Sequence, residues 1–137
     1  MTELGAESAR LAITGDDDVV RVRQLARSYA QQLKLSLVDQ TKLVTATSEL
    51  ARNTLTHGGG GAAEISIVRD SRRAGVRASF QDSGSGIPDI DLAMTDGWSS
   101  GNGLGLGLSG ARRLVDEFEL DSAVGRGTTV TVVKWGR

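Results

Sequence analysis

The 137-residue chain (14.4 kDa) is 39% hydrophobic and 24% charged, as is usual for one soluble globular domain, which we expect to span residues 1–137. Its 16 Lys and Arg residues and 17 Asp and Glu residues give a net charge of −1, which argues against a nucleic-acid binder, and the lack of cysteine excludes disulfides and zinc–thiolate sites. No apolar run approaches the roughly 18 residues of a membrane span and the N-terminus has no export signal, so we expect a cytoplasmic protein without a membrane partner.

The first half of the chain predicts one strand and then two helices. Ser8–Thr14 alternates polar and apolar residues, which is typical of an edge strand. Asp16–Asp18 supply an acidic helix start, and apolar residues recur at helical spacing as far as Leu33. Ser36 is expected to cap a second helix that runs to about His57. The apolar stripe of that second helix comprises Leu37, Leu43, Val44, Leu50, Ala51 and Leu55.

The second half predicts a hairpin, two helices and a last strand. The hairpin joins strands at Ala63–Asp70 and Val76–Gln81. A short helix is expected at Asp89–Met94, a longer one from about Leu106 to Phe118, and a final strand at Thr128–Trp135. This order predicts an α/β two-layer sandwich, in which helices cover one face of a mixed, mostly antiparallel sheet.

The distribution of glycine is the first indication of a ligand site. The chain has 18 glycines and one proline; eight of the glycines lie between Gly84 and Gly110, and four are consecutive at Gly58–Gly61. Because glycine in bulk weakens helices and strands, a folded chain that concentrates it usually needs its backbone close to a ligand.

Two oxygen-bearing side chains, Glu49 and Asn53, lie four residues apart in the predicted second helix and therefore share one face, away from the apolar stripe. Such a pair can hold Mg²⁺ together with waters and phosphates, or the carboxylate can act as a general base while the amide holds the metal. Taken alone, the pair is more often a solvated helix face, with Glu49 paired to Arg52 or to nothing.

Asp82 begins a second candidate motif, Asp82–Gly86, directly after the predicted strand at Val76–Gln81. A carboxylate at a strand end, followed by alternating glycines, can line a cleft and accept a hydrogen bond from an exocyclic amine. The same residues also suit a simple turn, with the aspartate as cap and glycine at positive φ.

A third motif, Gly101–Leu108, places glycine at every second position ahead of a predicted helix. Backbone N–H groups there can approach anionic oxygens, and the helix N-terminus adds a favourable field. The regular leucines between the glycines argue against a purely flexible loop. Gly105–Gly110 also matches the dinucleotide pattern GxGxxG, but no apolar strand precedes it, and no P-loop sequence occurs in the chain.

The order and spacing of four motifs resemble the GHKL ATPase/kinase superfamily. The motifs are SELARN on a helix, DSGSGIP after a strand, GNGLGLGL before a helix and GRGTTV in the last strand. That superfamily includes gyrase, Hsp90 and MutL ATPases, histidine-kinase catalytic domains and anti-sigma-factor serine kinases. The resemblance covers about Ala12–Trp135 and implies the Bergerat fold, with ATP bound between helices and a lid loop. The segment Asp96–Gly103 is a very short lid and lacks the phosphate-reaching lysine of the gyrase-like branch.

The resemblance also implies residue roles. Glu49 is expected as the general base and Asn53 as a ligand of Mg²⁺. Asp82 would accept a hydrogen bond from the adenine amino group, and Thr128 would assist it, often through a water. Backbone contacts are expected from Gly84 and Gly86 around the adenine, and from Gly101, Asn102, Gly103, Leu104, Gly105, Leu106 and Gly107 around the phosphates.

Within the superfamily, AMTDGWSSGNGLGLGLSGARRLVDEFEL and GRGTTVTVVKW are most similar to the small switch kinases of the RsbT type. Those kinases phosphorylate Ser or Thr on STAS-domain partners and, when released, activate a PP2C-type phosphatase. The implied function is an ATP- and Mg²⁺-dependent protein serine/threonine kinase of a stress-response partner-switching module. Two alternatives stay open: an anti-sigma-factor kinase that binds a sigma factor, and a nucleotide-responsive adaptor that transfers nothing.

Overall fold

The computed structural model describes residues 2–5, 7–84, 86, 94 and 107–136. The expected short helix at Asp89–Met94 lies outside these residues except for Met94, and Gly101–Leu106 lie outside them entirely. The elements are β1 (Thr2–Gly5), β2 (Ser8–Ile13), α1 (Asp16–Gln32), α2 (Leu37–Thr56), β3 (Gly61–Arg69), β4 (Ala74–Asp82), α4 (Gly107–Leu114), β5 (Glu117–Ala123) and β6 (Gly127–Trp135).

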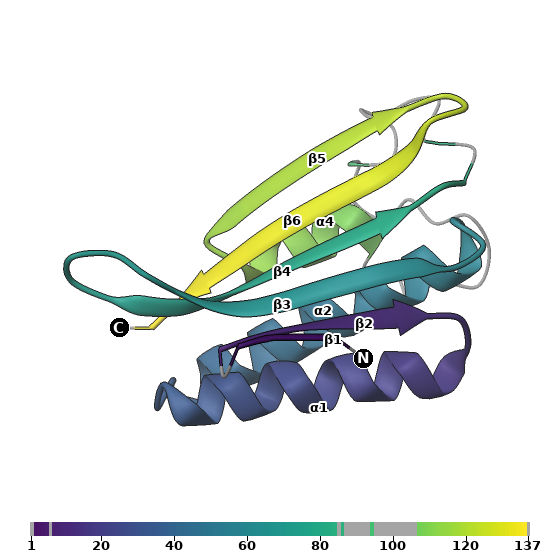
Figure 1. Cartoon of the computed structure of the whole chain (residues 1–137). Helices are drawn as coiled ribbons and strands as arrows, with labels where there is room; N and C mark the ends of the chain where they lie inside the picture. Colours follow the sequence, from purple (N-terminus) through teal and green to yellow (C-terminus); the bar gives the residue numbers. More distant parts are fainter. Residues whose placement is uncertain (1, 6, 85, 87–93, 95–106, 137) are drawn as a thin grey trace.

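The described strands form one six-stranded sheet in the order β1-β2-β3-β4-β6-β5, and each pairing between neighbours is antiparallel. The helices cover one face of this sheet (Figure 1). The predicted two-layer sandwich is therefore confirmed. β2 is not an edge strand as expected, because β1 pairs on its outer side; β1 has only four residues and no alternating pattern by which the sequence could reveal it. Within the described ranges, no helix is both long and apolar enough to cross a bilayer.

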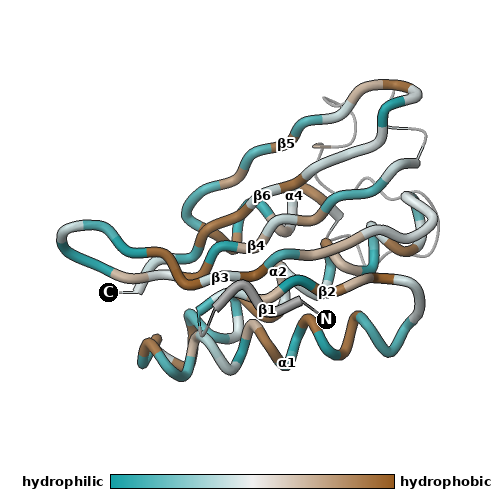
Figure 2. The backbone as a smooth tube through the Cα atoms, in the orientation of Figure 1, coloured by the Kyte–Doolittle hydropathy of each residue, from teal (hydrophilic) through white to brown (hydrophobic). Residues whose placement is uncertain are grey.

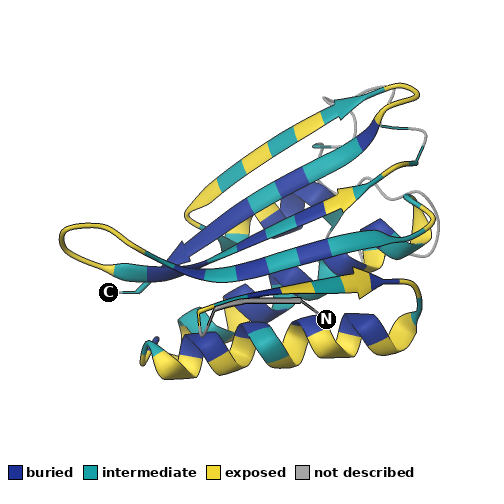
Figure 3. Cartoon of the chain, viewed as in Figure 1, coloured by how far each residue is buried: buried dark blue, intermediate teal, exposed yellow. Residues whose placement is uncertain are grey.

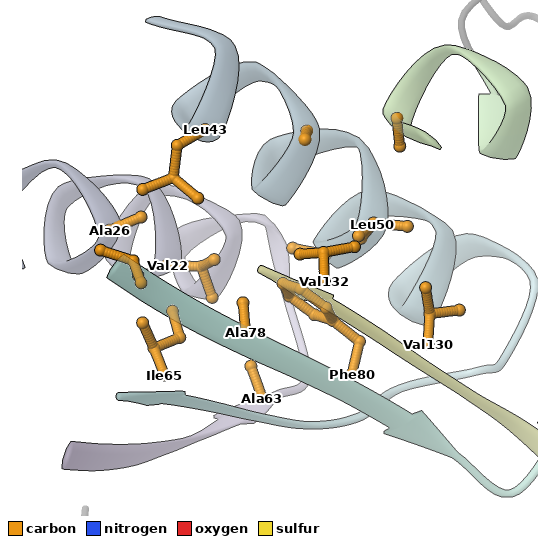
Figure 4. Packing of buried hydrophobic residues seen from close by; sticks show 14 of the residues in the cluster. Val22, Ala26, Leu43, Leu50, Ala63, Ile65, Ala78, Phe80, Val130 and Val132 are labelled. Atoms are coloured by element: carbon orange, nitrogen blue, oxygen red, sulfur yellow. The ribbon is translucent and has the colours of Figure 1, made fainter. Parts of the chain in front are cut away.

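The core lies between the sheet and the helices. Apolar residues alternate along the strands and recur along the helices (Figure 2), so each element buries one side (Figure 3). Figure 4 shows Phe80 of β4 and Val132 of β6 opposite Leu50 of α2, and all three are at most 2% exposed. Burial of a side chain of this size contributes roughly 1.5–3 kcal/mol, which fixes α2 on the sheet.

At the ends of α2 and α4, the cap predicted from the sequence is confirmed, but the spacing of apolar residues predicts one buried side chain and one helix end wrongly. Ser36 caps α2 as predicted, with its Oγ accepting a hydrogen bond from the Asp39 N–H at 3.1 Å. Leu37, placed on the buried stripe from its spacing, is 78% exposed. The helix predicted as far as Phe118 ends at Leu114, and Phe118 belongs to β5, where it pairs with Val132 of β6.

The antiparallel layout gives the molecule two distinct ends. At one end, which we call the strand-tip end, β4 finishes at Asp82, β6 begins at Gly127, and α2 finishes at Thr56. At the other end, which we call the hairpin end, the α1–α2 turn (33–36) lies beside the β3–β4 hairpin (70–73) and Gly136 (Figure 1). The strand-tip end holds the motifs singled out in the sequence.

Candidate functional site

The end of α2 and the tip of β4 are in direct contact through a glycine and an acid. A Cβ on Gly58 would lie 2.4 Å from both Cβ and Cγ of Asp82 and 2.6 Å from its Oδ2. A Cβ on Gly84 would in turn lie 2.9 Å from the Gly58 Cα and 3.2 Å from Asp82 Oδ1. The segment just after α2 and the tip of β4, 24 residues apart at Gly58 and Asp82, therefore meet at one place, because glycine leaves room for the Asp82 side chain.

Register shows which way Asp82 points. Across the sheet, Asp82 pairs with Thr128 of β6, and Thr128 pairs with Ser122 of β5. Two residues back on each strand, Phe80 pairs with Val130, and both are buried in the core beneath the helices. Since side chains alternate along a strand, Asp82, Thr128 and Ser122 form a polar row on the helix-facing side, where the apolar core ends.

The hydroxyl groups of this row are connected. Ser122 Oγ and Thr128 Oγ1 lie 2.8 Å apart, and Ser122 Oγ also donates to the Gly127 carbonyl at 3.2 Å. Asp82 Oδ1 accepts a hydrogen bond from the Gly84 N–H at 2.9 Å. Asp82 and Thr128 are half-buried, so both groups retain a path to a ligand. A carboxylate beside a hydroxyl can accept a hydrogen bond from an amine and position a water next to it.

Gly86, four residues after Asp82, lies against the end of β5. Gly86 has φ +81°, and a Cβ there would lie 2.1 Å from the Ala123 carbonyl oxygen. Both the left-handed conformation and this close approach require glycine. Gly84 and Gly86, predicted to shape a pocket, are thus fitted tightly between Gly58 and the end of β5.

Glu49 and Asn53 lie on α2 as predicted, one turn apart and about 40° apart around its axis. The Glu49 side chain is only 14% exposed, which does not fit a fully solvated face, although Arg52 Nη1 lies 3.8 Å from Glu49 Oε1. Asn53 is half-buried, and its carbonyl accepts from the N–H groups of His57 and Gly58 at 2.9 and 3.3 Å. Asn53 is therefore tied through the backbone to the glycine that contacts Asp82.

Only the last residue of the predicted phosphate loop is described. Gly107 begins α4 with φ +52°, and Leu108 after it is 6% exposed, in the core. Gly101, Asn102, Gly103, Leu104, Gly105 and Leu106 lie outside the described residues. The loop therefore enters α4 through a glycine in a left-handed conformation, and α4 packs beside α2, which carries Glu49 and Asn53.

The donor set on α2 fits a magnesium ion that is shared with a phosphate. In the described part of the chain, no three or more His, Cys, Asp or Glu side chains gather into a metal cluster. Mg²⁺ takes only one or two protein ligands when phosphates and waters supply the rest. The oxygens of Asn53 and Glu49 suit that role, whereas a metal held by protein side chains alone would need more ligands.

Two carboxyl groups with a lowered pKa lie outside this site. The N–H and hydroxyl of Thr14, with help from Arg21, lower the pKa of Asp18 at the start of α1. The N–H of Arg72 and the side chain of Arg73 lower the pKa of Asp70 in the β3–β4 hairpin. Both carboxylates organise local structure rather than the strand-tip end.

Sequence reasoning missed three residues of the site. Gly58 lies in the glycine run Gly58–Gly61, Gly127 lies in the GRGTTV segment, and Ser122 lies in none of the four motifs, so none of the three was given a role in the site. A Cβ on Gly127, which has φ +82°, would lie 2.2 Å from the Asp82 carbonyl oxygen. For Gly58 and Gly127 the only signal is the glycine itself, because their contacts with Asp82 join segments distant in the sequence. Ser122 carries no signal, because its pairing with Thr128 depends on the register between β5 and β6.

Comparison with known proteins identifies this arrangement. The sequence model of the family "Histidine kinase-, DNA gyrase B-, and HSP90-like ATPase" matches residues 38–135, which contain β4, β6 and all of α2 after its first residue. The chain belongs to this family. The resemblance to GHKL proteins stated from the four motifs is thus confirmed, and with it the Bergerat fold.

Individual relatives narrow the comparison. Over 120 residues the chain is 46% identical to the serine/threonine-protein kinase RsbT of Bacillus subtilis, covering 88% of this chain and 90% of the relative. It is 29% identical over 119 residues to an anti-sigma F factor of Geobacillus kaustophilus, covering 82% and 80%. The fold also matches a crystal structure of the RsbU and RsbW domains of Rv1364c from Mycobacterium tuberculosis, with a TM-score of 0.65 and 22% identity, over 95% of this chain and 33% of that one.

Proposed function

We propose that this protein is an ATP- and Mg²⁺-dependent serine/threonine kinase that phosphorylates a STAS-domain partner in a stress-response partner-switching module. When released from that partner, it binds and activates a PP2C-type phosphatase. The kinase class is supported by the 46% identity to RsbT, and ATP use by membership of the ATPase family. The observation that carries the proposal is the contact between Gly58 and Asp82, which joins the end of the Glu49–Asn53 helix to the acid after β4.

In the proposed mechanism, Asp82 recognises the adenine. Its Oδ1 is partly satisfied by the Gly84 N–H at 2.9 Å, and the Gly58 backbone confines the rest of the carboxylate. The second oxygen can accept from the exocyclic amine of adenine, which guanine lacks at that position. Thr128, held by Ser122 at 2.8 Å, is close enough in register to position a water against the same base.

Glu49 and Asn53 serve the other end of the nucleotide. Glu49 removes the proton from the hydroxyl of the partner's Ser or Thr, a general-base step that typically contributes about 10²–10⁴ in rate. The Asn53 side-chain oxygen would hold the magnesium ion, which when bound offsets charge on the phosphates. Gly107 and the glycines before it would hold the phosphates by their N–H groups at the start of α4. Catalysis then consists mainly of positioning and electrostatic stabilisation.

Two variants test these roles separately. Glu49→Ala should still bind ATP, measured by calorimetry, but should lose at least about 100-fold in transfer of labelled phosphate to a STAS protein. Asp82→Asn should weaken ATP binding and, through it, phosphorylation. Glu119→Ala and Asp121→Asn on β5 are matched controls, because both side chains are exposed on the sheet face away from the helices. If Glu49→Ala transfers phosphate at an undiminished rate, Glu49 is not the general base. If Asp82→Asn binds ATP with unchanged affinity, Asp82 does not accept a hydrogen bond from the adenine.

The similarity to anti-sigma F factors supports a second candidate, a kinase that binds a sigma factor and phosphorylates its antagonist. Co-purification from the source cell separates the two: STAS proteins with a phosphatase indicate the switch kinase, and a sigma factor indicates the alternative. If the protein binds ATP but transfers no phosphate to a STAS protein, the remaining alternative is a nucleotide-responsive adaptor. A single domain over residues 1–137 and a cytoplasmic location, where ATP and such partners are available, are part of the same proposal.

A further inference from the structure

A basic pocket lies at the hairpin end of the molecule, away from the candidate nucleotide site. It has a volume of about 460 Å³, and three separate segments contribute to it: the α1–α2 turn, the β3–β4 hairpin and the end of the chain after β6. The hairpin is hydrophilic (Figure 2) and exposed (Figure 3). The pocket is lined by Leu33, Lys34, Arg72, Arg73, Ala74 and Gly136.

Three cations line one pocket, and two of them have no carboxylate partner within the described residues. Among the residues that the structure describes, no carboxylate lies within ion-pair distance of Lys34 or Arg72. Arg73 is paired with Asp70, whose Oδ2 lies 3.0 Å from Arg73 Nε. The cluster therefore carries a local charge of about +2 on a chain whose net charge is −1.

The Arg73 side chain is positioned in this pocket by two contacts, one with Trp135 and one with Asp70. Its guanidinium carbon lies 4.1 Å from the centre of the Trp135 ring, and the Trp135 Nε1–H donates to Glu117 Oε2 at 2.7 Å. Asp70 Oδ2 accepts a hydrogen bond from Arg73 Nε. Asp70 Oδ1 accepts hydrogen bonds from the backbone N–H groups of Arg72 and Arg73, both at 2.9 Å. Binding to the two terminal nitrogens of Arg73 then costs little side-chain entropy, and those nitrogens match a carboxylate bidentately.

Lys34 occupies a backbone position that favours glycine. Its φ of +58° is the one positive value at a non-glycine residue in the described chain, and it directly follows the C-cap Leu33 of α1. Helices commonly end with glycine in this conformation, and a residue with a side chain is strained there. In a chain with 18 glycines, the lysine brings a cation to the pocket at a cost in backbone strain, which points to a use for that cation.

We propose that this pocket binds an acidic segment of a partner protein, with the partner's Asp or Glu side chains on Lys34, Arg72 and Arg73. The proposal rests on the proposed function only in expecting a protein partner, and not on phosphoryl transfer. An acidic peptide fits better than a nucleic acid, because Arg73 lies over the Trp135 ring, which is then not available to stack on a base. Leu33 and Ala74 supply apolar walls between the charges.

The test uses the full chain labelled with ¹⁵N and an acidic peptide of about 12 residues made of Asp, Glu and Ser, with its Asn/Gln counterpart as the neutral control. The acidic peptide should shift the amide signals of residues 33–36, 72–74 and 136, bind at least about tenfold more tightly than the neutral one, and weaken as salt rises from about 50 to 200 mM. Shifts centred on other residues, or equal binding of both peptides, would overturn the proposal.

Three variants sharpen the result. Lys34→Gly removes a cation and also relieves the strain of the left-handed backbone. It should therefore keep or raise the Tm, while the affinity for the acidic peptide should fall at least about tenfold. Arg72→Glu, which reverses a charge, should lower the affinity for the acidic peptide further. Arg27→Glu is the matched control, since Arg27 is exposed on α1 and does not line the pocket. Equal losses in Arg27→Glu and Arg72→Glu would mean non-specific attraction and would refute a built site.

Two further arms separate other occupants. If inorganic phosphate alone produces the same shifts and displaces the peptide, the pocket is a small-anion site and the proposal fails. If the same signals shift with protein concentration in the absence of peptide, a second copy of the chain is the occupant, and the proposal fails as well. ATP binding by Lys34→Gly should match that of the unmodified chain, so loss of peptide binding and failure of the kinase proposal are distinguishable.

Discussion

Gly58 provides the sharpest test of the site, because one added methyl group acts on both stability and ligand binding. In Gly58→Ala the new Cβ would lie 2.4 Å from Cβ and Cγ of Asp82. Contacts this short cannot be accepted in place, and the Asp82 Cβ is fixed by the backbone of β4. Either the end of α2 or the tip of β4 must therefore move.

The expected magnitude follows from that geometry. Forcing an extra carbon into a closely packed site typically costs about 1–3 kcal/mol. The lower conformational entropy of alanine in the unfolded chain offsets at most about 1 kcal/mol of that cost. We expect a net loss of stability of about 1–2 kcal/mol, and hence a fall in Tm of several degrees for a chain of this size. Because Asp82 is displaced, the affinity for ATP should fall by at least about tenfold, equivalent to 1.4 kcal/mol.

Thermal unfolding and calorimetric titration with ATP measure the two effects independently. Gly15→Ser is the matched control: a Cβ at Gly15 meets no atom within 4 Å, and serine is a favourable N-cap for α1. That variant should keep its Tm and its ATP affinity. If Gly58→Ala retains both, the close contact between α2 and Asp82 is refuted, and with it the geometric basis of the site.

Three further variants test other contacts. Ser122→Ala removes a hydrogen-bond partner of the Thr128 hydroxyl, and calorimetry should show the affinity for ATP falling several-fold. Ser79→Ala is the control: it removes a similar pair with Thr131 on the other face of the sheet and should leave the affinity for ATP unchanged. Since the pKa of Asp18 is lowered in the folded state, its contribution to stability is present above pH 4 and is lost as the pH falls through the folded pKa. Urea unfolding should show Asp18→Asn destabilised at pH 7, with a difference from the parent that shrinks steadily as the pH is lowered below 4; a difference that does not shrink would contradict the assignment. Lys134→Met removes the buried cation that lies between Asp39 and Asp116 and should cost about 2–3 kcal/mol. Asp39→Asn in the same chain should restore part of that stability, and strict additivity in urea unfolding would exclude the coupling.

The features predicted correctly from the sequence are those set by neighbouring residues. Ser36 precedes an apolar helical pattern and caps α2, and two alternating runs around a short polar turn form the β3–β4 hairpin. Glu49 and Asn53 share a helix face because four residues make about one turn. Asp82 could be placed at a strand end from its position alone. In each case the deciding interactions lie within a few residues.

The errors arose where distant segments decide the outcome. The run from Ala111 to Phe118 has helical spacing, but pairing with β6 draws Phe118 into β5, where its side chain still reaches the core. Leu37 shares a flank of α2 with the buried Val44, yet it lies in the first turn, where nothing in the described chain covers it. Nothing in the sequence marks Lys134, and only the fold shows its side chain, 4% exposed, between carboxylates of α2 and of the segment before β5.

The arrangement of α2 explains how one small domain can present two separate surfaces. With 20 residues the helix is about 30 Å long, so its ends lie at opposite ends of the sheet. Asp39 in its first turn pairs with the buried Lys134, and Gly58 just beyond its last turn contacts Asp82. Because both ends are anchored to the sheet and the middle is fixed by core residues such as Leu50, the helix cannot slide without breaking contacts at both ends. A protein segment bound at the hairpin end would therefore leave the strand-tip end free for nucleotide.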